Sequence, residues 1–573
     1  AYTVSLAMLG SLVFAILMAP LLSSYLMRRP GSKKGKKEGS ESLVVKILLI
    51  PYRPLVLFFV QRRIYAIILA VALLLLGGLV YPRLGSEFTP KLKEGIVVVR
   101  LTMAPSISLT ESKSMTMVVE RKLLNIPEVR EVVTRIGRGE VGAHSDPINS
   151  AEIYVLLKPK TEWRKKGDQE YIEELIREEL GVMPGILSNL TQPIEMTVDE
   201  LLEGVRAELA IKLFGRDLDT LKSKADEIAG VIRNIRGAAD VQADQVSGKP
   251  QLLIRPIREA IARYGINLED VQMVIRSAVG GEIAGQIFEG IRRFDILVRY
   301  EPDARRTTED IANLLIEAPD GKVVPLAELA EIREIVGPRQ IMRENTQRFI
   351  TVQCNVVGRD IGSFVEEAQQ AIDNMVDLPP GYLITWGGQF RLQQEANKRF
   401  AVVIPATLLI IGLLLFSNFG SLKNAVLILL NIPLALVGGV VALWISGQNL
   451  SVPASVGFIA LFGVALLNGV VLVTYLNQLR LKGLPMEEAS IQGACLRLRP
   501  VLMTALVAAL GMTPLLVSHG IGSEVQRPLA TVVVGGLVTS TTLTLLVLPA
   551  LYKWFSVPLE IENSRKKDLT MRG

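Results

Sequence analysis

Seven long apolar stretches limit what this chain can fold into more than any other feature. Each is close to the ~20 residues that an α-helix needs to cross the hydrocarbon core of a bilayer. None of them holds an Asp, Glu, Lys or Arg in its interior. The stretches run from Tyr2 to Leu26, Ile64 to Val80, Phe400 to Phe416, Ala425 to Trp444, Val456 to Leu476, Val501 to Ser518 and Leu529 to Leu551. The sequence therefore predicts an α-helical membrane bundle with seven transmembrane spans.

A large water-facing part must accompany these helices. The mean hydropathy of +0.36 is far above that of a soluble protein, yet 21% of the residues are charged. Most of the acidic residues lie between the second and third apolar stretches, from about Tyr81 to Arg399. The two cysteines, Cys354 and Cys495, fall in different regions and form no disulfide or metal-binding pattern. We therefore expect one extramembrane domain with a packed core of its own.

Basic residues predict the orientation in the membrane. They crowd into "MRRPGSKKGKK" after the first stretch, "LRLKG" and "LRLRP" between the fifth and sixth, and "NSRKKDLTMRG" at the end. All four segments lie on the same side, which the positive-inside rule identifies as the cytoplasm. The large domain therefore lies on the opposite side. The net charge of +6 reflects this topology and does not indicate a nucleic-acid partner.

The pattern divides the chain into six regions. The segment "SLVVKILLIPYRPLVLFFVQRR" is apolar but contains Pro51 and Pro54, which favours an interfacial helix against lipid over the alternative of an eighth span. The regions are a span at 1–27, a basic linker with the interfacial helix at 28–63, a span at 64–82, the external domain at 83–399, five helices at 400–553 and a basic tail at 554–573. The chain opens inside an apolar stretch without a signal-peptide pattern, so we expect the downstream part of a longer polypeptide.

The external domain contains a repeat of secondary structure. The first copy reads as strand "GIVVVRLTMA", helix "TESKSMTMVVERKLLNI", strands "VREVVTRIG" and "AEIYVLLKP", and helix "QEYIEELIREEL". The second reads as "ELAIKLFG", "LDTLKSKADEIAGVIRNI", "ADVQADQV", "QLLIRPI" and the helical stretches "REAIARY" and "LEDVQMVIRSAV". Two β-α-β-β-α units predict tandem ferredoxin-like subdomains.

A third, smaller docking subdomain is expected before the chain re-enters the membrane. The stretch "GGEIAGQIFEGIRRFDILVRY" leads into strand-rich sequence that ends at "ITWGGQF". Its glycines indicate a flexible loop over a cleft rather than a phosphate cradle. No strand is followed by GxxxxGK[ST], so ATP is not the expected energy source.

Long motifs in both regions resemble a known family. "FIALFGVALLNGVVLVTYLNQLR" and "RLRPVLMTALVAALGMTPLLVSHGIGSEVQRPLATVVVGGLVTSTTLTLLVLPALY" closely resemble the C-terminal helices of the resistance, nodulation and division (RND) transporters. "SAVGGEIAGQIFEG" and "PPGYLITWGGQF" resemble the heavy-metal efflux branch. The resemblance implies a proton-driven, homotrimeric exporter of the bacterial inner membrane that works with a periplasmic adaptor and an outer-membrane channel. Because family members have twelve spans and two periplasmic loops, this chain would be the downstream half plus one upstream span.

The resemblance also implies roles for polar residues in the membrane. The family's proton-carrying carboxylates lie on an upstream helix, and the spans here hold no titratable acid, so this chain alone should not transport. Arg497 and Thr504 match relay positions on the eleventh helix of the drug-exporting branch. Asn468 matches an asparagine beside the relay lysine on the tenth, although Leu467 replaces that lysine. The alternatives are a cytoplasmic anchor for Arg497 and Arg499, a backbone-bonded hydroxyl for Thr504 and an interhelical bond for Asn468.

Acidic residues are the candidate metal ligands. Copper(I) and silver(I) pumps of the family use a methionine cluster, and the equivalent stretch here is "EMTVDELLEGVRAELAIKLFG". It holds the single Met196 and five carboxylates, which are Glu195, Asp199, Glu200, Glu203 and Glu208. Glu200 stands where the copper-type methionine is expected. Glu208 resembles an acidic ligand of zinc-type relatives and is the first candidate. Oxygen ligands favour zinc, cobalt, cadmium or nickel over copper(I).

Other donors are weaker candidates. Glu269 and Asp270 in "INLEDV" are two further acidic residues that could bind metal. His144 is the only histidine of the external domain and lies in a polar loop, so we expect a surface residue rather than a ligand. All of these acids could instead form a solvated helix face.

The sequence thus predicts a secondary active transporter, not an enzyme, with a divalent metal ion as its substrate and no cofactor. Three alternatives stay open. The pump could export copper(I) or silver(I), or organic amphiphiles, although only 6% of the residues are aromatic. The chain could also be a truncated membrane scaffold that only docks an adaptor.

Overall fold

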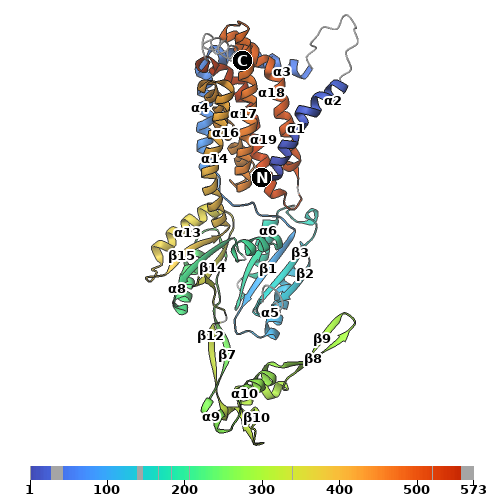
Figure 1. The fold of residues 1–573 in the computed structure, drawn as a ribbon, viewed down its shortest axis with the longest axis vertical. Helices are drawn as coiled ribbons and strands as arrows, with labels where there is room; N and C mark the ends of the chain where they lie inside the picture. The colour runs from blue at the N-terminus through green and yellow to red at the C-terminus, as the bar shows by residue number, and fades with distance from the viewer. Residues whose placement is uncertain are drawn as a thin grey trace, which may run out of the picture.

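The computed structural model describes residues 2–26, 43–137, 146–165, 167–181, 183–205, 207–338, 340–518 and 520–556. The described part is elongated, with a helical bundle at one end and two α/β units beside it (Figure 1). A third, smaller unit lies at the far end of the molecule, beyond the α/β units. His144 lies outside the described residues, as does the side chain of Glu203.

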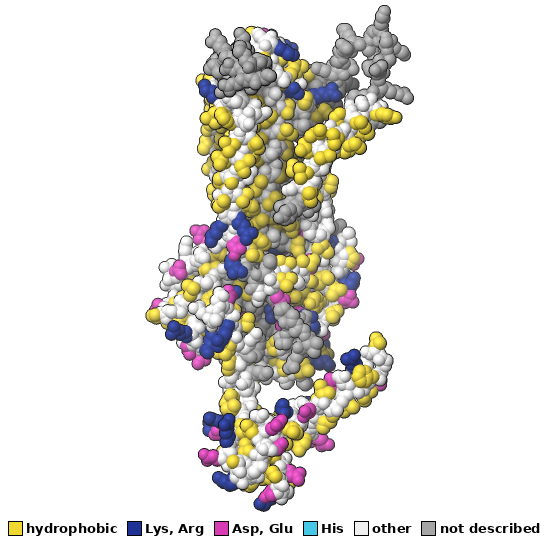
Figure 2. All heavy atoms as spheres, viewed as in Figure 1, with side chains coloured by type: hydrophobic (Ala, Val, Ile, Leu, Met, Phe, Trp, Pro, Cys, Tyr) yellow, Lys and Arg dark blue, Asp and Glu magenta, His cyan; other side chains and the backbone are white. Residues whose placement is uncertain are grey.

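Seven helices in the described part are long and apolar enough to cross a membrane. Two of the seven are broken, one at a π-helical turn between α1 and α2 and one between α15 and α16. The elements are α1 (Tyr2–Val13), η1 (Phe14–Met18), α2 (Ala19–Leu26), α4 (Arg63–Val80), α14 (Gln389–Phe419), α15 (Leu422–Leu429), α16 (Asn431–Ile445), α17 (Val452–Leu481), α18 (Met486–Val517) and α19 (Ser523–Phe555). Hydrophobic side chains predominate on the face of the bundle seen in Figure 2, as expected for a surface in contact with lipid.

The centre of the bundle is held by close contact between α16 and α19. A Cβ on Gly438 would lie 2.4 Å from the carbonyl oxygen of Gly535, and a Cβ on Gly535 would lie 2.3 Å from the Cβ of Ala442. Only glycine lets the two backbones approach this closely, which is the usual way small residues join membrane helices. The α16–α19 pair is therefore packed backbone against backbone at these glycines.

An additional helix, α3 (Leu43–Gln61), lies at the bundle end that carries the C-terminus (Figure 1). It packs against α18 and α19, and the buried hydroxyl of Tyr52 donates to the carbonyl oxygen of Leu545 over 2.9 Å. Pro51 and Pro54 lie inside this helix without ending it. It corresponds to the stretch for which we predicted an interfacial helix.

The first α/β unit has the β-α-β-β-α-β arrangement of ferredoxin-like folds. Its elements are β1 (Ile96–Met103), α5 (Leu109–Leu124), β2 (Val129–Ile136), β3 (Ser150–Leu157), α6 (Gln169–Leu180) and β4 (Ile186–Thr191). All pairings are antiparallel and the strand order is β2-β3-β1-β4. The buried Val119 and Leu123 of α5, and Ile172 and Ile176 of α6, recur every four residues and pack on the sheet. The strand pattern missed only β4.

The second α/β unit repeats this topology but is interrupted. It consists of β5 (Leu209–Gly215), α8 (Leu218–Arg233), β6 (Ala238–Ala243), β14 (Gln347–Val356), α13 (Ile361–Met375) and β15 (Leu383–Gly388). The order β6-β14-β5-β15 matches that of the first unit, and β13 (Arg343–Glu344) extends β14 into a hairpin. The predicted second repeat was therefore wrong in its second half. "QLLIRPI" belongs to β7 (Ser247–Pro256), which pairs with β12 (Ala330–Pro338) outside this sheet.

The ribbon of β7 and β12 leads to the far unit. It contains α9 (Arg258–Arg263), α10 (Leu268–Ile275), η4 (Arg276–Gly280), η5 (Pro302–Arg305), α11 (Thr308–Ala312), β10 (Leu315–Glu317), β11 (Val323–Pro325) and α12 (Leu326–Leu329). The glycine-marked segment forms the hairpin of β8 (Glu282–Glu289) and β9 (Arg292–Val298), which projects away from the rest of the chain (Figure 1). Our prediction of a flexible loop there was wrong, because the segment forms two paired antiparallel strands with one register shift between Ile283 and Gly285.

Candidate functional site

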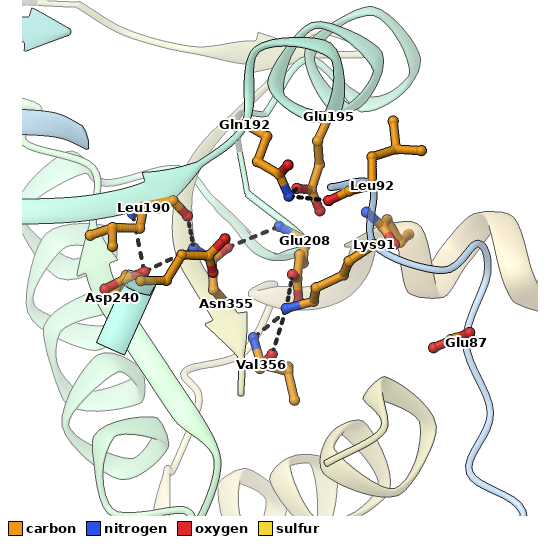
Figure 3. A network of polar contacts seen from close by, with 12 residues as sticks. Glu87, Lys91, Leu92, Leu190, Gln192, Glu195, Glu208, Asp240, Asn355 and Val356 are labelled. Atoms are coloured by element: carbon orange, nitrogen blue, oxygen red, sulfur yellow. Dashed lines mark hydrogen bonds and ion pairs between the residues drawn. The ribbon is translucent and has the colours of Figure 1, made fainter. Parts of the chain in front are cut away.

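A small polar cavity lies where the two α/β units meet. It offers about 20 Å³ of free volume, which is of the order that one water molecule occupies. Strands, helices and one irregular segment far apart in the sequence all contribute to its wall (Figure 3). The lining residues are Lys91, Glu173, Arg177, Leu190, Thr191, Gln192, Glu195, Asp199, Glu208 and Asn355. The lining therefore contains four carboxylates and two basic side chains.

The helix α7 (Pro193–Glu203) supplies two of the carboxylates. Proline at its first position needs no hydrogen-bond partner for its nitrogen, and the Glu94 carboxylate accepts from the backbone N–H groups of Ile194 at 2.9 Å and Glu195 at 3.3 Å. A carboxylate at this end also complements the helix dipole. Glu195 and Asp199 are four residues apart and so lie on the same face, toward the cavity.

Glu208 stands directly before β5, and its two carboxylate oxygens have different partners. Oε2 accepts a hydrogen bond from the backbone N–H of Val356 over 3.1 Å. Oε1 forms an ion pair with the ammonium group of Lys91. Only 11% of the Glu208 side chain is exposed, so this charge depends on those two contacts.

Lys91 lies in the irregular segment between η2 (Tyr81–Arg83) and β1. Its Nζ donates to the carbonyl oxygen of Val356 over 2.9 Å in addition to its contact with Glu208. Burial opposes the charge on Lys91, but Glu208 and Glu195 outweigh burial and raise the pKa of the ammonium group. Lys91 is therefore charged at any physiological pH.

Burial also affects the acids of the cavity. Burial, together with the neighbouring carboxylate of Glu208, raises the pKa of Glu195 to about 8. Burial likewise raises the pKa of Glu173. Glu195 is therefore mostly protonated, and so uncharged, at neutral pH.

A second network fixes the wall behind Glu208. The amide of Asn355 donates to the carbonyl oxygen of Leu190 and to Asp240, each over 2.9 Å, and accepts from the backbone N–H of Glu208 over 3.3 Å. Arg177 pairs with Asp240 at 3.3 Å. These contacts join β4 of the first unit to β14 of the second, so the cavity depends on how the two units meet.

The cavity is also tied to a membrane helix. The backbone N–H of Gln389, the first residue of α14, donates to the carbonyl oxygen of Glu208 over 2.9 Å, and its side-chain amide donates to Asp199 over 3.3 Å. Gly388 has a φ of +77°, and a Cβ there would lie 2.4 Å from the same carbonyl oxygen. Glycine is therefore required for this close approach.

The structure brings together three of the acids in the predicted metal-binding stretch, Glu195, Asp199 and Glu208. Glu200 instead lines a larger cleft of about 530 Å³. Glu269 and Asp270 lie in the first turn of α10 in the far unit, and do not meet Glu208. No three Asp, Glu, His or Cys side chains within the described ranges converge closely enough to hold a metal ion. Sequence reasoning missed Lys91, because nothing in "EFTPKLKEG" marks one lysine as buried against an acid.

Two of the predicted relay residues meet where α18 packs on α17, with Asn468 buried and Thr504 exposed. The hydroxyl of Thr504 on α18 donates to the amide oxygen of Asn468 on α17 over 2.8 Å and also contacts its own helix at Val501. Arg497 lies with its guanidinium carbon 4.1 Å from the ring centroid of Tyr475. Since α18 begins at Met486, Arg497 and the exposed Arg499 lie within the helix rather than in front of it.

Comparison with known proteins places these features in a family. The family model described as "AcrB/AcrD/AcrF family" matches residues 1–556. The chain belongs to this family of RND transporters. It is 41% identical over 561 residues to the cobalt-zinc-cadmium resistance protein CzcA of Cupriavidus metallidurans, with 96% of this chain and 52% of that protein covered. It is 40% identical over 555 residues to the nickel and cobalt resistance protein CnrA of the same organism, covering 96% and 51%.

The chain is also similar to a solved structure. The crystal structure of a heavy metal efflux pump matches with a TM-score of 0.80 and 38% identity, over 89% of this chain and 52% of that one. The RND fold, with its apolar helices and sheet-rich domain, is therefore shared. The chain spans about half the length of the curated relatives that it matches.

Proposed function

We propose that the protein takes part in proton-driven efflux of divalent heavy-metal cations, of the zinc, cobalt, cadmium or nickel type. The observation that carries this proposal is the cavity at Glu208, whose donors are carboxylates and amides. Oxygen ligands suit these ions better than copper(I), which prefers thioether and thiolate sulfur. Among the described residues that line the cavity there is no Met or Cys. The cobalt, zinc, cadmium and nickel named for CzcA and CnrA agree with this choice.

In this proposal the cavity is a transit site rather than a storage site. Glu208 contributes Oε1, and Glu195 and Asp199 approach it from α7 after a small movement of that helix. The free volume suits one ion with few remaining waters. A site whose donors do not converge before binding holds its ion weakly, which favours release. The remaining candidate acids are proposed as secondary ligands elsewhere on the route of the ion through the external domain. They are Glu200, Glu203, Glu269 and Asp270.

Proton coupling is proposed to involve Asn468, Thr504 and Arg497. Thr504 and Asn468 share a hydrogen bond between two helices, and a hydroxyl–amide pair can pass a reorientation from one helix to the other. Both groups are neutral, so the proton carriers themselves are proposed to lie outside this sequence. The supporting observation is that the two residues meet, which sequence matching alone did not require.

Assembly as a homotrimer in the bacterial inner membrane is part of the same proposal. The hairpin β8–β9 exposes Ile287, Phe288, Ile291 and Phe294, and Ile291 at its tip is fully exposed. A projecting strand pair with apolar side chains and no cover within the described chain is suited to enter a second copy. The far unit that carries it would then face an adaptor protein and an outer-membrane channel.

Metal tolerance tests this proposal. A host without its own pumps expresses the complete gene, either unchanged or with Glu208→Gln, and grows on zinc, cobalt, cadmium, nickel, copper and silver. We expect tolerance to divalent ions that is lost in Glu208→Gln. Glu259→Gln, an exposed acid on α9, is the matched control and should retain tolerance. Full tolerance in Glu208→Gln would reject the cavity as the transit site, and tolerance to silver alone would favour the copper-type alternative.

A further inference from the structure

We propose that Lys91 is a built-in counter-ion that competes with the transported metal for Glu208 and thereby sets how tightly the cavity holds its ion. The inference rests on the proposed function, since it names a residue that controls the same site. It concerns a positioning residue and not a ligand, because an ammonium group has no lone pair to offer a metal.

The competition follows from the contacts of the Glu208 carboxylate. Oε2 is occupied by the backbone N–H of Val356, which cannot leave without breaking the strand end. Oε1 is therefore the oxygen that a metal would use, and it is the oxygen that pairs with Lys91. A cation entering the cavity and the ammonium group of Lys91 cannot both occupy this position. Binding of metal is thus an exchange of one cation for another.

A second position is open to the ammonium group of Lys91 when a metal displaces it from Glu208. Its side chain is 42% exposed, and besides the small cavity it lines a neighbouring one of about 620 Å³. That larger cavity also contains Glu87, Glu173 and Asp360, whose carboxylates can receive the displaced ammonium group. The four-carbon stem of lysine is flexible enough for such a swing.

The backbone of this segment stays in place during the exchange. The amide of Gln192 donates to the carbonyl oxygen of Leu92, and the N–H of Glu94 donates to the same side chain over 2.9 Å. These bonds anchor the chain immediately after Lys91 to Gln192, the residue that directly precedes α7. Within this segment the lysine side chain is therefore the part that moves relative to α7, and it can return to Glu208 once the metal leaves.

This exchange suits a transporter better than a binding protein. A permanently charged competitor raises the apparent dissociation constant of the ion, because part of the binding free energy goes into breaking the Lys91–Glu208 pair. The return of the ammonium group then favours release on the far side. Removal of the lysine charge should accordingly tighten binding and slow turnover at once.

Zinc binding by the complete purified protein tests the inference. Lys91→Met keeps most of the length of the side chain and removes its charge, whereas Lys91→Arg keeps the charge. We expect the zinc dissociation constant, measured by competition with a chromogenic chelator, to fall about tenfold or more in Lys91→Met and to change little in Lys91→Arg. Zinc tolerance of cells should fall in Lys91→Met despite the tighter binding. Lys93→Met, two residues away and outside the small cavity, is the control for a lost lysine charge.

A merely structural role gives a different pattern. If Lys91 only stabilised the fold, Lys91→Met would weaken zinc binding and lower tolerance together, and that result would overturn the inference. An unchanged dissociation constant in folded Lys91→Met would overturn it as well. Failure of the proposed function is distinguished by Glu208→Gln, which would then bind zinc as tightly as the unchanged protein.

Discussion

Thr504 donates a hydrogen bond to Asn468 over 2.8 Å, and this contact joins the exposed face of α18 to a buried amide on α17. From the sequence, the resemblance assigned these residues to two helices but did not predict a contact between them. The Nδ2 atom of Asn468 has no hydrogen-bond partner within the described residues. A buried amide whose NH2 group has no partner is suited to change partners, as the proposed coupling role requires.

Thr504→Val should therefore reduce transport more than stability. An interhelical hydrogen bond in a membrane contributes about 0.6 kcal/mol, so the melting temperature should barely change. Zinc tolerance and zinc-driven proton flux in vesicles should fall clearly, and Thr504→Ser should restore both. Thr513→Val on the same helix is the control, since the hydroxyl of Thr513 bonds to the backbone of its own helix at Ala509. Equal losses in both valine variants would contradict a role specific to Thr504.

Gly388→Ala should damage the cavity without touching any of its side chains. An alanine there meets the carbonyl oxygen of Glu208 at 2.4 Å and also adopts an unfavourable positive φ, which by itself costs about 1–3 kcal/mol. We expect a lower melting temperature together with weaker zinc binding. Gly381→Ala has a φ of +86° and open space around it, so it should lose stability only. Unchanged zinc affinity in Gly388→Ala would show that the Glu208 backbone can move freely.

The pair of Glu128 and Arg164 should make stability depend on pH in the acid range. Two hydrogen bonds from Arg164, at 2.6 and 2.9 Å, hold the pKa of Glu128 below its usual range. A lowered pKa means that the contribution is present at neutral pH and is lost as the pH falls through the folded-state pKa. The difference in melting temperature between the unchanged protein and Arg164→Gln should thus be constant above pH ~5 and shrink below pH ~4. A difference that persists at pH 3 would argue against the ion pair as its source.

Ile291→Glu should prevent assembly of the complete protein while leaving each copy folded. Ile291 is fully exposed at the tip of β8–β9, so the substitution removes no contact within the described chain. A charge buried in an apolar interface is strongly unfavourable. Light scattering in detergent should show a change from trimer to monomer with an unaltered circular dichroism spectrum. Val323→Glu, an exposed apolar residue on β11, is the control and should stay trimeric.

The sequence predicted the elements whose pattern is local. Apolar length located the membrane helices, and alternating residues located β2 and β3. It could not predict that β6 pairs with β14, because the chain leaves the sheet and returns only after the whole far unit. The strand-like "QLLIRPI" follows β6 directly and was therefore assigned to the wrong sheet.

For the candidate site too, local features were predictable from the sequence and long-range contacts were not. Glu195 and Asp199 are four residues apart on one helix, so a common face could be expected from spacing. Glu208 was found by resemblance to metal exporters. Lys91 comes from a segment more than a hundred residues earlier in the chain, and its contact with Glu208 arises only from the meeting of two folded units.

The attachment of Gln389 to Glu208 links the cavity directly to the bundle through one continuous helix, α14. The helix is 31 residues long, about 46 Å at 1.5 Å per residue, and it runs without a break from the cavity wall into the bundle (Figure 1). Pro405 removes one of its internal hydrogen bonds partway along, which makes that point the easiest place to bend. Under the proposed function, an ion that binds beside Glu208 would tilt the part of α14 before Pro405 relative to the rest of the helix. Binding of the ion in the external cavity would then change the position of α14 inside the bundle without any charge having crossed the membrane.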